Sequence, residues 1–178
     1  PPVRTVDQKI GPCGAAGSVR GTNVMVLEPG AMLPVRWTEP INHPSHYRIS
    51  FDADGQDFTI PLDFMDFTQT QNVVLDNIAD GGSPYMSMIQ LPNVTCENCT
   101  LQLIQMMYDK APYGDGNDIY LQCADIALRT GAGYTVRSSS SGDINGDGWP
   151  DVVVTTSAQS NLNPGRLHVF FGGPGHDD

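Results

Sequence analysis

The chain has 178 residues, of which 39% are apolar and 16% charged, enough for one domain with a real core and a small appendage. Its 20 acidic and 9 basic side chains give a formal net charge of −11, which argues against binding to nucleic acid or anionic lipid. No apolar run reaches the roughly 18 residues that a membrane-spanning helix requires, so we expect no membrane partner.

Short runs that alternate apolar and polar residues predict β-strands along the whole chain. Turn residues separate these runs, in keeping with the 19 glycines and 14 prolines. The fold class predicted is all-β: an immunoglobulin-like antiparallel β-sandwich followed by a C-terminal β-hairpin calcium-loop module. The predicted strands are residues 24–27, 33–37, 47–51, 58–60, 73–75, 86–91, 100–108, 119–128, 151–156 and 166–171.

The composition changes in a stretch of small residues, Gly131–Gly142, which includes four consecutive serines. We therefore predict a sandwich domain over residues 1–130, a Gly/Ser linker over 131–142 and a calcium-binding repeat over 143–178. Within the sandwich, we expect Met86, Met88, Met106 and Met107 to fill gaps in the core.

The cysteines are Cys13, Cys96, Cys99 and Cys123. An even count in a loop-rich chain fits two disulfides and an oxidising compartment. We favour Cys13–Cys123 with Cys96–Cys99, while the other two pairings stay open. Free thiols are one alternative, and a four-thiolate zinc site based on the Cys96-x-x-Cys99 spacing is another.

Two glycosylation sequons agree with a secreted or extracellular location. They begin at Asn93 and Asn98, which each precede a threonine by two positions. They would be used only in an organism that glycosylates asparagine.

The clearest candidate site is the loop that starts at Asp143. Asp143, Asn145, Asp147 and Asp151 stand at positions 1, 3, 5 and 9, and the carbonyl of Trp149 can add another oxygen. Calcium takes six to eight oxygen ligands, and alternate side chains of a tight loop converge on one point. An EF-hand would need glutamate at position 12, where this chain has valine, and a β run follows. The pattern predicts a calcium site in a β-hairpin.

The stretch from Gly142 to Gly175 resembles an FG-GAP repeat of integrin-type propellers. The likeness rests on the acidic loop, the apolar run Val152–Val154 and the closing segment Leu167–Pro174. A single repeat leaves strand edges unpaired. We therefore expect it to pack on the sandwich, to adjoin further blades or to associate with another molecule through these edges.

Residues 1–130 resemble the lytic polysaccharide monooxygenase-like sandwiches, especially the chitin-binding type with a C-x-x-C…C-A-D-I pattern. Four patches carry the resemblance, and their order and spacing match the family. They are Pro1–Arg4 with Gly11–Gly14, Asn42–Arg48, Leu91–Pro92 with Cys96–Gln102, and Tyr120–Ile126.

The resemblance implies copper held in a histidine brace, in which an N-terminal histidine gives its amine and ring. His43 matches the second brace histidine, His46 is its rival, and Tyr120 matches the axial aromatic residue. The family's first histidine would lie upstream of Pro1, so this sequence carries only part of the brace. No catalytic residue is assigned.

Three functions follow from these patterns. The leading one is a secreted calcium-binding protein with a binding or structural role at a polysaccharide or cell-surface glycan. The first alternative is a copper-dependent enzyme that cleaves polysaccharide oxidatively, provided that a histidine precedes Pro1. The second is a subunit of an extracellular filament or adhesive assembly.

Overall fold

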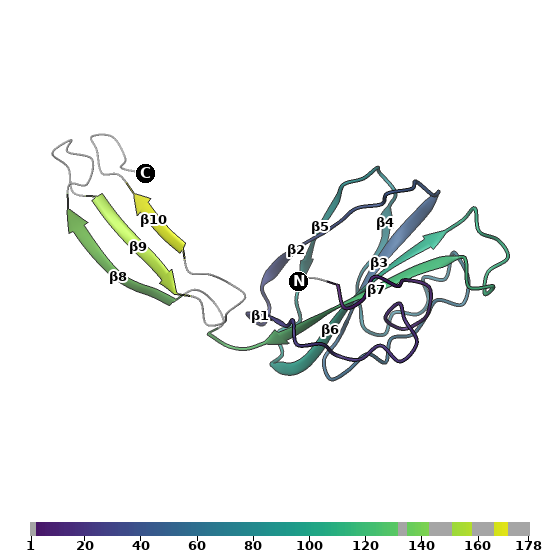
Figure 1. Ribbon diagram of the computed structural model, residues 1–178, viewed down its shortest axis with the longest axis horizontal. Coiled ribbons are helices and arrows are strands. Elements are labelled where there is room, and N and C mark those ends of the chain that lie inside the picture. Colours follow the sequence, from purple (N-terminus) through teal and green to yellow (C-terminus); the bar gives the residue numbers. More distant parts are fainter. Residues whose placement is uncertain (1–2, 132–134, 143–150, 158–165, 171–178) are drawn as a thin grey trace. The chain divides into compact units, whose positions relative to one another are not determined.

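The computed structural model describes residues 3–131, 135–142, 151–157 and 166–170, with side chains described for 3–131 (Figure 1). The chain forms two compact units, unit 1 over Pro1–Thr130 and unit 2 over Gly131–Asp178. The described residues contain ten strands and no helix, and hence no helix able to cross a membrane.

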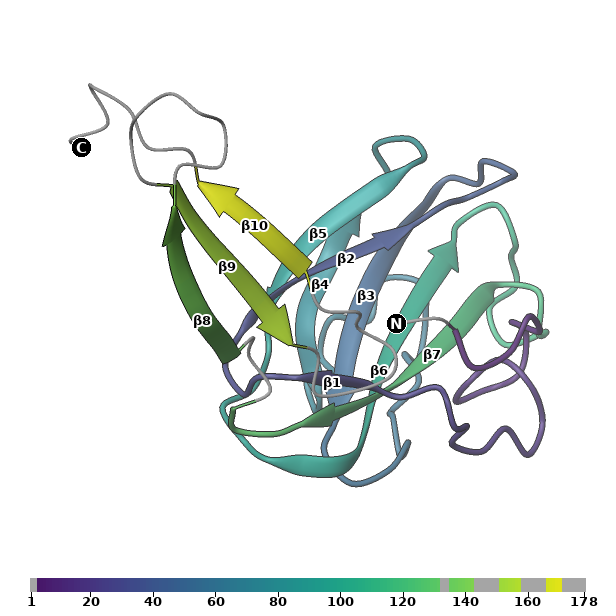
Figure 2. The ribbon, with the colours of Figure 1, turned by 60° about the vertical axis from the view of Figure 1, so that its left-hand side comes forward.

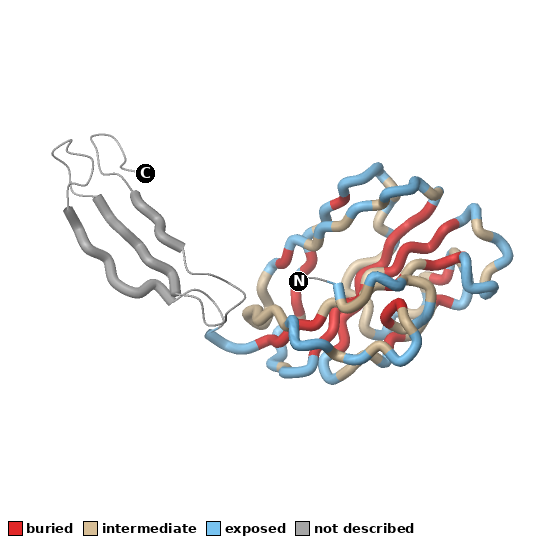
Figure 3. The backbone as a smooth tube through the Cα atoms, viewed as in Figure 1, coloured by how far each residue is buried: buried red, intermediate tan, exposed pale blue. Residues whose placement is uncertain are grey.

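A five-stranded sheet forms the centre of unit 1. The β1–β7 pair is parallel and the other three pairs are antiparallel. Buried residues run along its middle strands, drawn in red in Figure 3. The strand order is β1 (Met25–Leu27), β7 (Ile119–Leu128), β6 (Cys96–Met107), β3 (Ser45–Asp52) and β4 (Val73–Ala79).

A two-stranded antiparallel ribbon, β2 (Met32–Trp37) with β5 (Tyr85–Gln90), covers one face of this sheet (Figure 2). The ribbon buries Leu33 and Ile89 against Ile49, Phe51 and Leu101 of the sheet. The all-β, sandwich-like prediction is confirmed. One strand pair, β1–β7, is parallel and so departs from the predicted antiparallel sandwich. Parallel pairing needs a long connection, and the strands between β1 and β7 provide it.

Strand alternation divides the sheet into a ribbon face, packed on β2 and β5, and a loop face on its other side. On the ribbon face, Tyr47, Gln105 and Tyr120 form one cross-strand row. On the loop face, the neighbouring row begins with His46, which is opposite Met106. Adjacent residues of one strand therefore belong to different environments.

The loop face is covered by irregular segments rather than by strands. Ile104, Met106 and Leu121 are buried there, with Ile60 packed against them. Phe58 is buried with the Cys13–Cys123 disulfide. The strand predicted over residues 58–60 does not form, because its apolar side chains pack on the sheet from a loop.

The N-terminal segment is tied to β7. The Arg4 guanidinium forms an ion pair with Asp125, whose side chain is only 4% exposed. Further along, the backbone N–H of Leu121 donates to the carbonyl of Gln8 over 2.7 Å. These contacts hold Lys9, the next residue, beside the start of β7.

The methionines fall into two groups. Met106 and Met107 are fully buried, as expected of core residues, but Met86 and Met88 are 57% and 47% exposed. The core prediction is wrong for the second pair, because they occupy the alternate positions of β5 whose side chains face away from the sheet.

The described residues of unit 2 form three antiparallel strands in the order β10 (Arg166–Phe170), β9 (Asp151–Ser157) and β8 (Thr135–Gly142). The segment 131–142 was predicted to be a linker, but most of it forms the strand β8. Its small residues do not prevent strand formation, because the backbone pairs with the valine-rich β9.

Both disulfides have the pairing favoured from the sequence, Cys13–Cys123 and Cys96–Cys99. All four sulfurs are therefore engaged in covalent bonds, which excludes the free-thiol and zinc alternatives. The first bond joins residues 110 positions apart and the second residues 3 apart.

We predict that Cys13→Ala/Cys123→Ala lowers the free energy of unfolding by about 4 kcal/mol, because a long loop loses most entropy when it is closed in the unfolded chain. The matched variant Cys96→Ala/Cys99→Ala removes a disulfide that closes only a short loop, so it should lose about 2 kcal/mol. Urea unfolding followed by fluorescence measures both, and equal losses would contradict the ordering.

Candidate functional site

A pocket of about 670 Å³ opens at the end of the ribbon face, beside the Tyr47–Gln105–Tyr120 row. A second hollow of about 410 Å³ shares Lys9, His43 and Tyr120 and is also lined by Asp109 and Asp115. We call the two hollows together the His43 pocket. The first hollow is also lined by Trp37 and Glu39.

His43 lies in the loop between β2 and β3, and hydrogen bonds fix both its backbone and its ring. Its backbone N–H donates to Glu39 Oε1 over 2.9 Å. Its Nδ1 lies 3.0 Å from Asp109 Oδ2. With Nδ1 engaged, Nε2 is the ring nitrogen left for a ligand.

Glu39 is the polar anchor of this loop. Its Oε1 also accepts a hydrogen bond from Gln105 Nε2, and its Oε2 accepts one from the Tyr85 hydroxyl. Burial opposes the charge of Glu39, but the hydrogen bonds from His43, Tyr85 and Gln105 outweigh it and hold its pKa below the ordinary value. Glu39 is therefore ionised at neutral pH and serves as a positioning group.

Tyr120 lines the pocket from β7, and a cation covers its ring. Lys9 Nζ lies 3.8 Å from the ring centroid and donates to the carbonyl of Asn117 over 3.0 Å. A cation over an aromatic face is attracted by the ring quadrupole. The Lys9 ammonium group therefore lies against the Tyr120 ring inside the pocket.

His46 is separated from this pocket by the sheet itself. It is 2% exposed on the loop face, its Nδ1 is bonded to the Tyr108 hydroxyl, and its ring packs 5.1 Å from that of Phe67. Burial lowers the pKa of His46, so the ring is neutral at pH 7. The assignment of His46 as a rival brace ligand is corrected, because it cannot share a metal with Tyr120.

The pocket offers a copper ion only part of the ligand set that the histidine brace requires. Among the described residues that line it, His43 supplies the one imidazole, with Lys9 close by. Imidazole nitrogen suits copper, but one ring does not make a brace. The described residues therefore fit the second brace position and no more.

The calcium-loop residues Asp143, Asn145, Asp147 and Trp149 lie outside the described residues. The strands on either side are described, and Asp151 begins β9. Gly142, the last residue of β8, is the register partner of Asp151. Residues 143–150 therefore connect two strand ends that lie side by side, as a hairpin calcium loop requires.

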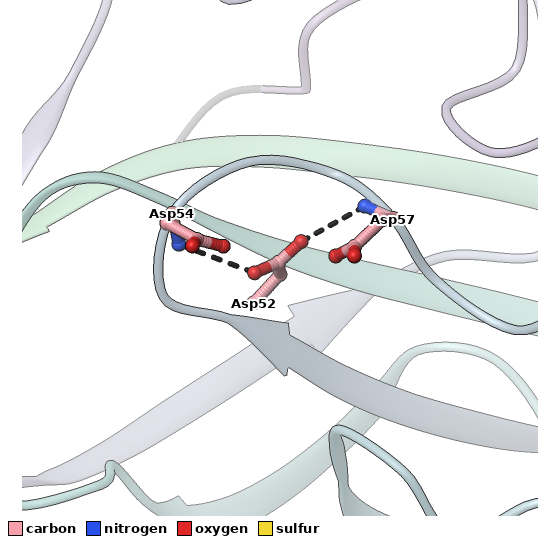
Figure 4. A group of neighbouring side chains, drawn as sticks. All are labelled: Asp52, Asp54 and Asp57. Atoms are coloured by element: carbon pink, nitrogen blue, oxygen red, sulfur yellow. Dashed lines mark hydrogen bonds between the residues drawn. The ribbon is translucent and has the colours of Figure 1, made fainter.

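A second acidic group was not expected from the sequence: Asp52, the last residue of β3, with Asp54 and Asp57 from the turn that follows it (Figure 4). One carboxylate oxygen from each lies within 4.8 Å of the others. The buried Asp52 accepts the backbone N–H groups of Asp54 and Asp57 over 3.2 and 2.8 Å. These bonds account for the cluster as the closure of a turn, and we assign no metal to it.

The two sequons differ in their surroundings. Asn93 and Thr95 are both exposed in the connection between β5 and β6. Asn98 is exposed within β6, but the threonine of its sequon, Thr100, is only 1% exposed in the folded chain. Asn93 is therefore the better placed of the two for a surface glycan.

Residues 135–170 match the family model of the FG-GAP repeat, which confirms the expected resemblance of this region. The matched range spans β8, β9 and β10. Among curated proteins, no match is found.

Among solved structures, the chain is similar to a lytic polysaccharide monooxygenase AA15 from Thermobia domestica in the Cu(I) state. The similarity has a TM-score of 0.44 and 20% sequence identity, over 67% of this chain and 76% of that chain. A likeness of this size carries no functional conclusion for this chain.

Sequence reasoning missed most polar residues of the pocket, among them Lys9, Glu39 and Asp109. Glu39 stands four residues before His43 in a proline-bounded loop, and this spacing could have suggested a contact. Lys9 and Asp109 reach the pocket from segments distant in sequence, which no local pattern indicates.

We predict that Asp109→Ala removes the preference of the neutral His43 ring for one tautomer. In the native protein the carboxylate favours the proton on Nδ1, and without it both tautomers should be populated. Long-range ¹H–¹⁵N correlation spectra at alkaline pH measure the tautomer ratio. Asp115→Ala, which removes another acidic wall of the same hollow, is the control. An unchanged ratio in Asp109→Ala would contradict the assigned role.

Proposed function

We propose that the protein is an exported calcium-binding protein whose ion site is the hairpin loop of Asp143, Asn145, Asp147, Trp149 and Asp151. The FG-GAP match over residues 135–170 carries this proposal. The Gly142–Asp151 register supports it, because it holds the two ends of the loop together.

The donor set favours calcium over softer ions. Carboxylate, amide and backbone carbonyl oxygens are the ligands of hard cations, and the loop offers no imidazole or thiolate. The high negative charge of the chain also favours a divalent cation as ligand.

Two features support export. Both disulfides join cysteines of the sandwich, and disulfides persist in oxidising compartments. The accessible sequon at Asn93 agrees with this location.

We predict that Asp147→Ala removes most of the thermal stabilisation that millimolar calcium gives to unit 2, because ion binding stabilises the folded state by mass action. In EDTA, the variant and the native protein should melt at nearly the same temperature. Calorimetric scans with and without calcium make the comparison.

Asp54→Ala is the matched control, since it removes one carboxylate from the other acidic cluster. The calcium effect should survive in this variant. If Asp147→Ala loses equal stability in calcium and in EDTA, or if Asp54→Ala abolishes the calcium effect, the ion does not bind in the hairpin loop.

For unit 1 we propose a binding or structural role at a polysaccharide or cell-surface glycan. The pocket combines aromatic side chains, Trp37 and Tyr120, with polar groups such as Gln105 and Gln122. Sites for small neutral ligands commonly unite apolar surface with a few fixed polar groups. The aromatic rings and amides offer both to a sugar.

A copper-dependent oxidative enzyme is the alternative that His43 favours. His43 would supply one ring nitrogen, Asp109 would orient that ring and Tyr120 would line the site. A bound copper ion would supply the redox chemistry, and the other nitrogen ligands would come from outside this sequence.

We predict that this chain binds Cu(II) only weakly at neutral pH and that His43→Ala weakens this binding further, because a single imidazole anchors the ion. Isothermal titration of both proteins measures the affinities, with His168→Ala as the control. Tight one-to-one binding that is unchanged in His43→Ala would show that His43 is not a copper ligand.

An assembly role is the second alternative, and the strand order favours it. Among the described strands of unit 2, β8 and β10 each pair on one side only. Unpaired strand edges can add a strand from another molecule.

A further inference from the structure

The buried ring of His46 is hydrogen-bonded on one side only. Its Nδ1 is bonded to the Tyr108 hydroxyl, whereas its Nε2 is shielded from solvent and has no partner among the described residues. A protonated ring carries an N–H on both nitrogens, so the proton on Nε2 would be buried without an acceptor. Burial of an unpaired donor and of an unpaired charge is costly. The closed structure therefore accommodates the neutral ring and not the protonated one.

A second cationic side chain is buried next to this ring. Arg48 follows His46 by two positions in β3, so both side chains lie on the loop face, and Arg48 is 0% exposed. Asp76 accepts hydrogen bonds from Arg48 Nε and Nη2 over 3.0 and 2.8 Å, one on each carboxylate oxygen. The charge of Asp76 is thus already paired with Arg48, and a proton on His46 would add a second positive charge to the same buried region.

Residues 61–68, which we call the cover, lie over these two side chains. The Phe67 ring lies 5.1 Å from the His46 ring. The backbone carbonyl of Asp66 accepts a hydrogen bond from Arg48 Nη2 over 2.6 Å. The cover therefore contacts both residues directly, and its closed position depends on their charge state.

The cover is held by local bonds rather than by a sheet. Its residues form no strand, and the Asp66 carboxylate accepts the backbone N–H groups of Leu62 and Thr68, each over 2.9 Å. Segments with few backbone bonds to the rest of a fold open at a lower free energy than the core strands. The cover can therefore open while the sheet stays folded.

Titratable and charged groups face His46 from each element packed around it: Arg48 from β3, Asp76 from β4, Tyr108 from the end of β6 and Asp66 from the cover. Burial lowers the pKa of His46 most, Asp76 opposes this effect and Arg48 adds to it. Hydrogen bonds, led by the Thr68 hydroxyl, lower the pKa of Asp66 to about 2, so this carboxylate stays ionised at mildly acidic pH.

We propose that His46 and Arg48 form an acid-sensitive latch, in which protonation of His46 opens the cover and gives the ring access to water. Because the pKa of His46 is lowered in the closed state, the open state binds the proton more readily. The closed state is fully stable above the ordinary histidine pKa of about 6.5 and loses stability as the pH falls below it. The latch shares no residue with the calcium loop and needs no ligand in the His43 pocket.

Hydrogen exchange of the full chain at pH 7 and pH 5, resolved to single amides by NMR, tests the latch. Protection factors remove the intrinsic pH dependence of exchange, and those of the Leu62 and Thr68 amides should fall about tenfold at pH 5, since one proton changes an equilibrium by up to about tenfold per pH unit. In His46→Gln the fall should be less than about twofold, because the amide can still bond to Tyr108 but does not titrate.

His43→Gln is the matched control, because it makes the same replacement at the other histidine of unit 1, and it should respond to pH like the native protein. An equal fall in the native protein and in His46→Gln, or no fall in the native protein, overturns the proposal. If His46→Gln does not fold, the ring signals of the native protein decide. Protonation of His46 should coincide with the loss of protection, and a ring that is protonated while the cover amides stay protected contradicts the latch.

Discussion

The register that joins β3, β6 and β7 determines which side chains can meet at the candidate site. Because strand side chains alternate between the two faces, the row Tyr47–Gln105–Tyr120 lines the His43 pocket, and the next row lies beneath the loops. A slip of one residue would exchange the two faces. It would place His46 in the pocket and turn Tyr47 away from it. The chemistry open to unit 1 therefore depends on this pairing.

The same constraint acts on the ribbon and on unit 2. In β5, alternation buries Tyr85 and Ile89 but leaves Met86 and Met88 in solvent. In unit 2, the pairing of Gly142 with Asp151 confines the acidic loop to a hairpin end. The pocket in unit 1 and the paired strand ends in unit 2 thus both follow from strand pairing.

Alternating runs predicted most strands of the sandwich, and β7 has the predicted bounds. The sequence failed where burial is set by distant partners. Phe58 looked like part of a strand because it is apolar, but it packs from a loop on the Cys13–Cys123 disulfide. Met86 and Met88 looked like core residues because methionine is apolar, although their strand positions face solvent. The Ser-rich segment was predicted to be a linker because its own residues show no alternating apolar pattern. It forms a strand by pairing with β9, which the sequence of β8 alone does not indicate.

The candidate site was predictable only in part. His43 and Tyr120 were identified as neighbours through a family resemblance, and both line one pocket. Lys9 and Asp109 could not be found, because sequence alone does not show which loops meet at the end of a sheet. To choose between His43 and His46, one must know on which side of the sheet each lies. That depends on the strand register rather than on local composition.

Carbethoxylation of the folded protein by diethyl pyrocarbonate, read out by peptide mass spectrometry, tests this division of faces most directly. His43 should be modified at its open ring nitrogen, and His46 should stay unmodified until the protein is denatured. Modification of His46 at the rate of His43 in the folded protein would contradict the register on which the account rests.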